Sequence, residues 1–187
     1  QILAISEKAN LGPFTGQLLV GEMNKPRIMR VMLEEVGGEL QGACIPFIDG
    51  SPLGRGCNRM DWAPDGSLFV GQTKHTWAGG QGIQRVSWNG KIPFEIRNME
   101  LSKKGFTFTF TQAVDKKSAL QKENWPFKRY FFEYRQAYGS PRSDEMEVEI
   151  SKIEISGDGK IVEIFLSELK PWHIHEVNIQ NLKTQNG

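Results

Sequence analysis

A glycine-rich segment between two expected strands contains three side chains that could bind a ligand. Lys74, His75 and Trp77 lie within four residues of one another and precede the glycine-rich run 78–82. An indole ring can stack on a sugar while an ammonium or imidazole group contacts the sugar hydroxyls. The alternative is that Trp77 packs between sheets and His75 is solvated, which is the commoner role of such residues.

Two arginines nearby in the sequence could hold an anionic group. Arg55 and Arg59 flank Cys57, and a planar guanidinium forms paired hydrogen bonds with a carboxylate, such as that of a quinone cofactor. They could equally pair with Asp49 or Asp61, and such surface pairing is the commoner arrangement. The candidate ligand-binding residues are therefore Arg55, Arg59, Lys74, His75 and Trp77.

Histidines and cysteines offer little for metal chemistry. His173 and His175 are two residues apart, so on a strand they share one face and could chelate a metal, but no third ligand accompanies them. The sequence therefore predicts no metal site. Cys44 and Cys57 enclose a 12-residue segment, and this spacing is compatible with a disulfide or with two free thiols.

Sequence motifs of several enzyme classes are absent. The chain has no Gly-x-Ser-x-Gly elbow, no phosphate-binding glycine loop and no Cys-x-x-Cys-His haem attachment motif. No residue is identified as catalytic.

Composition and charge narrow the class of protein. The formal net charge is +1, and acidic and basic residues are interspersed, which argues against nucleic acid as the main partner. No apolar run approaches the roughly 18–20 residues of a membrane-spanning helix. The chain begins at Gln1 with neither a methionine nor a signal peptide, which we interpret as a processed or excised piece of a longer protein.

Turn signals between β-rich runs predict an all-β fold. Pro64-Asp65-Gly66, Asn89-Gly90 and Gly157-Asp158-Gly159 supply the positive φ angles that tight hairpins need. One short helix of about two turns is expected over Asp115–Glu123, with Asp115 as its N-cap. The expected strands are Gln17–Gly21, Arg27–Leu33, Gly42–Ile48, Arg59–Ala63, Leu68–Gln72, Ile83–Trp88, Phe94–Leu101, Phe106–Thr111, Phe127–Gln136, Glu147–Ser156, Ile161–Leu166 and His173–Ile179.

Side-chain alternation indicates which strand faces are buried. Phenylalanine and threonine alternate over Phe106–Thr111, so three rings face a core and three hydroxyls face water. The aromatic run Trp125–Tyr134 could form a carbohydrate platform. Because it has aromatic residues on both faces, burial is the favoured interpretation.

A weak internal repeat divides the chain near Pro93. Gly16–Gly21 followed by Arg30-Val31 has the same outline as Gly66–Gly71 followed by Arg85-Val86, a period of about 50 residues that is typical of propeller blades. We place the boundary within residues 93–100 and predict propeller blades over 1–95 and an immunoglobulin-like sandwich over 96–187. About two blades cannot close a propeller, so preceding blades or a partner chain must complete it.

Residues on both sides of this boundary resemble one protein family. Pro64–Gly71 and the segment from Trp88 through Asn89-Gly90-Lys91-Ile92-Pro93-Phe94-Glu95-Ile96 are similar to the end of the propeller in large secreted bacterial proteins of the sorbosone and glucose dehydrogenase type. Tyr138-Gly139-Ser140-Pro141 and His173–Glu176 resemble the C-terminal immunoglobulin-like module of the same proteins. The resemblance covers nearly the whole chain.

The resemblance implies a fold, a location and a set of partners. It implies a secreted or periplasmic protein in which this C-terminal portion is a carbohydrate-related binding and structural module. The characterised sugar dehydrogenases of this propeller class hold pyrroloquinoline quinone and calcium, and members are often fused to haem domains, but their ligand positions do not match residues here. The alternatives are part of a quinone-dependent sugar dehydrogenase that passes electrons to a haem partner, and a structural assembly protein of the cell surface.

Overall fold

A computed structural model describes residues 1–73 and 82–187. The fold is all-β with antiparallel sheets, and no sheet is closed. The chain forms two compact units, Gln1–Pro93 (unit 1) and Phe94–Gly187 (unit 2), which are described separately. Within the described residues, no helix is long and apolar enough to cross a membrane.

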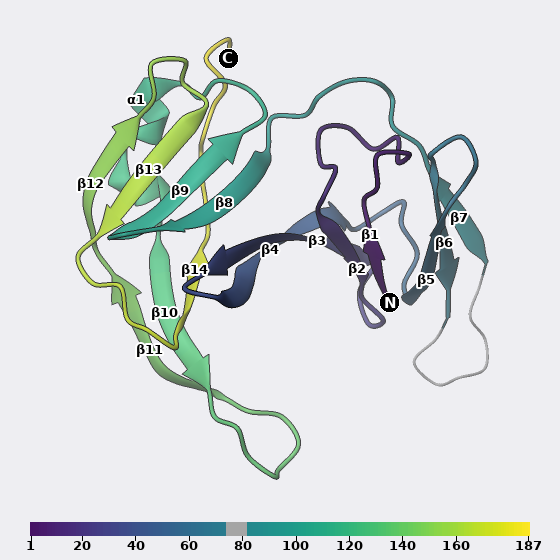
Figure 1. The fold of residues 1–187 in the computed structure, drawn as a ribbon, viewed down its shortest axis with the longest axis horizontal. Helices are drawn as coiled ribbons and strands as arrows, with labels where there is room; N and C mark the ends of the chain where they lie inside the picture. The colour runs from purple at the N-terminus through teal and green to yellow at the C-terminus, as the bar shows by residue number, and fades with distance from the viewer. Residues whose placement is uncertain (74–81) are drawn as a thin grey trace. The chain divides into compact units, whose positions relative to one another are not determined.

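Unit 1 contains two sheets whose strands follow one another in sequence order (Figure 1). Each strand pairs antiparallel with the next, as expected of meanders. Gly66, at φ +80°, lies in a turn between two of these strands, in agreement with the predicted tight turn. One sheet has the order β1 (Ile2–Ala4), β2 (Leu18–Gly21), β3 (Arg27–Val36) and β4 (Glu39–Asp49), and the other has β5 (Cys57–Trp62), β6 (Leu68–Gln72) and β7 (Ile83–Val86).

The two sheets of unit 1 share one hydrophobic core. Leu19 and Ile28 of the first sheet and Leu68 and Val70 of the second are fully buried in it. The amide side chain of Gln1 donates to the carbonyl of Met60 (3.0 Å) and accepts from its N–H (2.6 Å), which links the edge strands β1 and β5. Unit 1 is therefore a pair of sheets packed face to face.

Unit 2 also contains two sheets, but its strands are not in sequence order. One sheet has the order β12 (Ile150–Ile155), β13 (Ile161–Leu166), β9 (Gly105–Phe110) and β8 (Ile96–Ser102). The other has β11 (Arg142–Val148), β10 (Phe127–Phe132) and β14 (Ile174–Val177). The expected single strand Glu147–Ser156 is wrong, because the chain passes from one sheet to the other at Glu149 and both Val148 and Ile150 are buried.

Aromatic rings fill the core of unit 2. Phe108 and Phe110 are buried, which confirms the inward face predicted from the Phe-Thr alternation, whereas Phe106 is only half-buried. Trp125 lies between them, with ring centroids 5.2 Å from Phe108 and 6.3 Å from Phe110. Its indole N–H donates to the carbonyl of Ala119 (2.9 Å), so its polar atom is satisfied inside the core.

The predicted helix is present but shorter than expected. Asp115 accepts a hydrogen bond from the N–H of Ser118 (2.8 Å), which confirms its role as N-cap. The α-helix α1 spans Lys116–Ala119 only, and the 3₁₀ turn η1 spans Lys122–Asn124. The expectation of one helix of two turns is wrong because Gln121 between them is extended, with ψ of 110°.

Candidate functional site

The sequence-predicted ligand-binding residues are not gathered into one described site. Lys74, His75 and Trp77 lie outside the described residues. Arg55 and Arg59 are exposed, and the guanidinium of Arg59 donates to the backbone carbonyl of its neighbour Asn58 (3.2 Å). Asp49, a suggested partner of these arginines, pairs instead with Arg27 across the β3–β4 ladder, at 2.6 Å.

Cys44 and Cys57 are both free thiols, so the structure does not contain the disulfide considered above. Cys44 is exposed on β4, whereas Cys57 begins β5 in the other sheet, is fully buried and has its sulfur 3.4 Å from the carbonyl oxygen of Gly54. Desolvation raises the pKa of both thiols above the ordinary value.

The two histidines near the C-terminus have different surroundings. His173 contacts the carboxylate of Asp144, whereas the ring of His175 packs at 5.6 Å from Phe106. Burial lowers the pKa of His175, which favours its neutral form. Among the described residues, no group of three or more His, Cys, Asp or Glu side chains could hold a metal ion.

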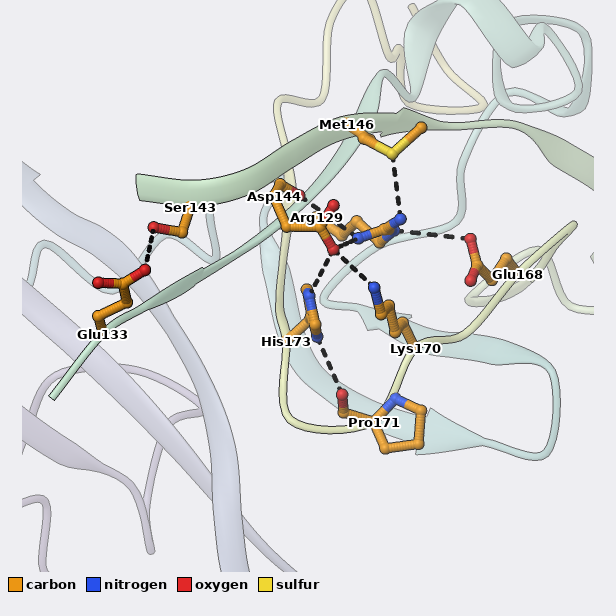
Figure 2. A network of polar contacts seen from close by, with 9 residues as sticks. All are labelled: Arg129, Glu133, Ser143, Asp144, Met146, Glu168, Lys170, Pro171 and His173. Atoms are coloured by element: carbon orange, nitrogen blue, oxygen red, sulfur yellow. Dashed lines mark hydrogen bonds and ion pairs between the residues drawn. The ribbon is translucent and has the colours of Figure 1, made fainter. Parts of the chain in front are cut away.

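Asp144 on β11 is the centre of a polar network that the sequence did not reveal (Figure 2). Its Oδ2 atom accepts from Lys170 (2.6 Å), contacts Nε2 of His173 (3.0 Å) and also accepts from Arg129. These hydrogen bonds, from Lys170, Arg129 and His173, hold the pKa of the Asp144 carboxyl well below its usual range. The carboxylate therefore stays ionised and joins β10, β11 and the segment before β14.

Arg129 is the buried member of this network. Its residue is only 5% exposed, and its guanidinium contacts Glu168 (3.5 Å) and the sulfur of Met146 (3.1 Å) besides Asp144. Two carboxylates thus compensate one buried cation, as a charge withdrawn from water requires. We interpret the Asp144 network as a structural connection, because its side chains neutralise one another.

A second polar cluster covers the outer side of β10. The hydroxyl of Tyr130 donates to Glu176 (3.0 Å), and Arg142 both pairs with Glu176 (2.7 Å) and lies 4.0 Å over the Tyr130 ring. Burial and the hydrogen bond to Glu176 raise the pKa of Tyr130. The aromatic run Trp125–Tyr134 is thus mostly packed at its beginning, as favoured above, while Tyr134 at its end is fully exposed.

The strongest candidate for a functional surface is the side of the sheet β1-β2-β3-β4 that faces away from the core of unit 1. We call it the outward face. Strand register gives its members, because Leu19 and Ile28 face the core and side chains alternate along each strand. They are Ile2, Ala4, Leu18, Val20, Met29, Val31, Leu33, Leu40, Gly42, Cys44 and Pro46, with Glu35 at one end and the ion pair Arg27–Asp49 at the other.

The outward face is apolar and partly exposed. Ile2 is 64% exposed, Leu33 45% and Leu40 71%, while Leu18, Met29 and Val31 are half-buried. The opposite sheet of unit 1 has a mixed outward face, on which the charged Arg59, Asp61 and Arg85 lie beside the exposed Phe69 and Ile83. Charged side chains on this face suit a sheet that is wet on one side.

A signal for the outward face was present in the sequence. The run Ile28–Leu33 contains five apolar residues and Arg30, so both faces of this strand are largely apolar. Such a pattern is typical of a strand covered on both sides. No comparable signal marked Asp144, since it lies in an ordinary polar run, Ser143–Glu145.

No family model, no curated protein and no solved structure matches the chain.

Proposed function

We propose that the chain is a non-catalytic binding and structural module of a larger secreted or periplasmic β-propeller protein related to sugar dehydrogenases. In this proposal, unit 1 is a pair of neighbouring blades and unit 2 is an immunoglobulin-like module. The observation that carries the proposal is the apolar outward face of the sheet β1-β2-β3-β4.

An apolar sheet face of this kind requires a cover. Each apolar side chain withdrawn from water contributes about 25 cal/mol per Å² of buried surface, so the free energy favours covering the whole face. Contiguous apolar patches on a protein surface mark sites of association. The module therefore functions by packing this face against another surface.

A further blade of the parent protein is the occupant that fits best. The core face of the same sheet is already covered by the sheet β5-β6-β7, and the two sheets have related sequences at Gly16–Gly21 and Gly66–Gly71. In a propeller each blade packs between two similar blades. A preceding blade would pack on the outward face of the sheet β1-β2-β3-β4, in the same way that the sheet β5-β6-β7 packs on its core face.

Strand order supports the assignment of unit 2. We name the strands β8 to β14 as A, B, C, C′, D, E and F in chain order. The sheet β8-β9-β13-β12 then has the order A-B-E-D, and the sheet β11-β10-β14 has the order C′-C-F. These are the strand orders of an immunoglobulin-type sandwich. Trp125, which is buried two residues before β10, matches the position of the core tryptophan near strand C. We propose that this sandwich is the structural and interaction domain of the parent.

Self-association of the isolated chain tests the proposal. The uncovered face should bind an apolar dye and associate as concentration rises, which sedimentation velocity measures. The double variant Val31→Thr, Leu33→Thr on the outward face should reduce both effects. Phe69→Thr is the control, since Phe69 is 40% exposed on the outward side of the other sheet, among charged side chains. A chain that remains monomeric without dye binding, or an equal response of both variants, would overturn the proposal.

A further inference from the structure

The strand β14 has one edge that pairs with β10 and another that pairs with no strand in the part of the chain that the structure describes. Open edges expose backbone N–H and C=O groups that can bind a further strand. The register shows which groups these are.

Backbone hydrogen bonding on β14 alternates between its two edges. The N–H of Asn178 donates to Pro126 (3.2 Å) and that of Gln180 to Asn124 (2.9 Å), both on the β10 side. In an antiparallel ladder this parity continues every second residue, so Glu176 and Ile174 also bond toward β10. The N–H and C=O groups of His175 and Val177 therefore point to the open edge.

A buried polar atom lies on a residue of the same edge. Nε2 of His175 is buried and has no hydrogen-bond partner among the described atoms, although its ring packs on Phe106. Buried polar atoms are normally satisfied. A hydroxyl side chain opposite His175 on an added strand would face the same side and could supply the missing partner.

We propose that the open edge of β14 receives one further antiparallel strand, supplied by the parent polypeptide. The inference rests on the parent protein of the proposed function and names a second contact within it. In the immunoglobulin-type arrangement proposed for unit 2, β14 is strand F, and strand G pairs with strand F at the edge that is open here. The strand carries a hydroxyl residue opposite His175 and an apolar residue opposite Val177.

One register of self-pairing between two β14 strands is unfavourable. When His175 lies opposite Val177, the two Glu176 side chains stand opposite each other, and like charges in that position destabilise a sheet. Pairing between copies in other registers is distinguished by the concentration dependence of the exchange test below.

Amide hydrogen exchange tests the edge. In the chain as it stands, the His175 and Val177 amides should exchange at least about tenfold faster than that of Glu176, which is bonded to β10. We would then add the strand VKTKVKTKV after Gly187 through a flexible Gly-Ser linker, which raises its effective concentration to about the millimolar range. The His175 and Val177 amides should slow at least about tenfold.

Two proline variants serve as controls. Replacing the central valine of the added strand by proline should abolish the protection. Val177→Pro should also abolish it, while the β10 ladder persists because the Val177 N–H points to the open edge. Unchanged exchange in the extended chain would overturn the proposal, as would protection of His175 and Val177 that rises with concentration in the unextended chain, since this would indicate pairing between copies. Neither result concerns the outward face of unit 1, so the two proposals fail separately.

Discussion

Adjacent leucines on β2 provide a direct comparison of the two faces of the sheet β1-β2-β3-β4. Leu19 faces the core of unit 1 and is 0% exposed, whereas Leu18 lies on the outward face and is half-buried. Replacing each by threonine keeps strand propensity and removes the same apolar volume. The two variants therefore differ mainly in which face they disturb.

The expected losses of stability differ severalfold. Large-to-small changes of a buried leucine cost about 2–5 kcal/mol, and an unpaired buried hydroxyl adds about 1–3 kcal/mol. Leu19→Thr should thus lower the free energy of unfolding by at least about 3 kcal/mol. Leu18→Thr should cost less than about 1 kcal/mol, because its face is uncovered in the isolated chain.

Urea unfolding followed by tryptophan fluorescence measures this difference. With a denaturant slope of about 1–3 kcal/mol per M, the Leu19→Thr midpoint should fall by about 1 M or more, and the Leu18→Thr midpoint should fall by less than about a third as much. Equal losses for the two variants would refute the assignment of an uncovered outward face.

Three further predictions concern unit 2. The native pKa of Asp144 lies below the unfolded value of about 3.9, so the contribution of this carboxylate to stability is present above that pH and is lost as the pH falls below about 4. Between pH 7 and pH 3, the melting temperature should therefore fall less steeply for Asp144→Asn than for the unchanged chain. Parallel curves of melting temperature against pH would contradict this. Trp172 is 94% exposed at φ +62°, so Trp172→Gly should stabilise the fold by about 1 kcal/mol, measured by chemical denaturation, and a loss of stability would contradict this. Phe108→Ala should cost about 3–5 kcal/mol, because its fully buried ring packs on Trp125, whereas Phe132→Ala, at a ring 50% exposed, should cost less in the same assay.

Local patterns predicted the elements that local physics determines. The Phe-Thr alternation of Phe106–Thr111 and the N-cap at Asp115 were both visible in the sequence, because side-chain period and capping act over a few residues. Strand Leu68–Gln72 was predicted with its observed ends. The short first strand Ile2–Ala4 was missed, because three residues carry too little pattern.

Features that depend on distant pairing were not predictable in the same way. The break at Glu149 separates two strands of different sheets, and the alternation on either side continues through it. Asp144 contacts side chains that lie 15 to 29 positions away from it in sequence. Its left-handed backbone (φ +54°) occurs with no glycine beside it. Only the register of β10 with its neighbours brings these side chains together.

Thiol labelling of Cys44 tests the central claim most directly, since this thiol lies on the outward face and the buried Cys57 is an internal control. Maleimide reaction is followed by mass spectrometry of the native isolated chain and of the native parent protein that contains it. In the isolated chain, Cys44 should react and Cys57 should not. In the parent, the account predicts that Cys44 becomes protected by the neighbouring blade, and a Cys44 that reacts equally fast in both would contradict it.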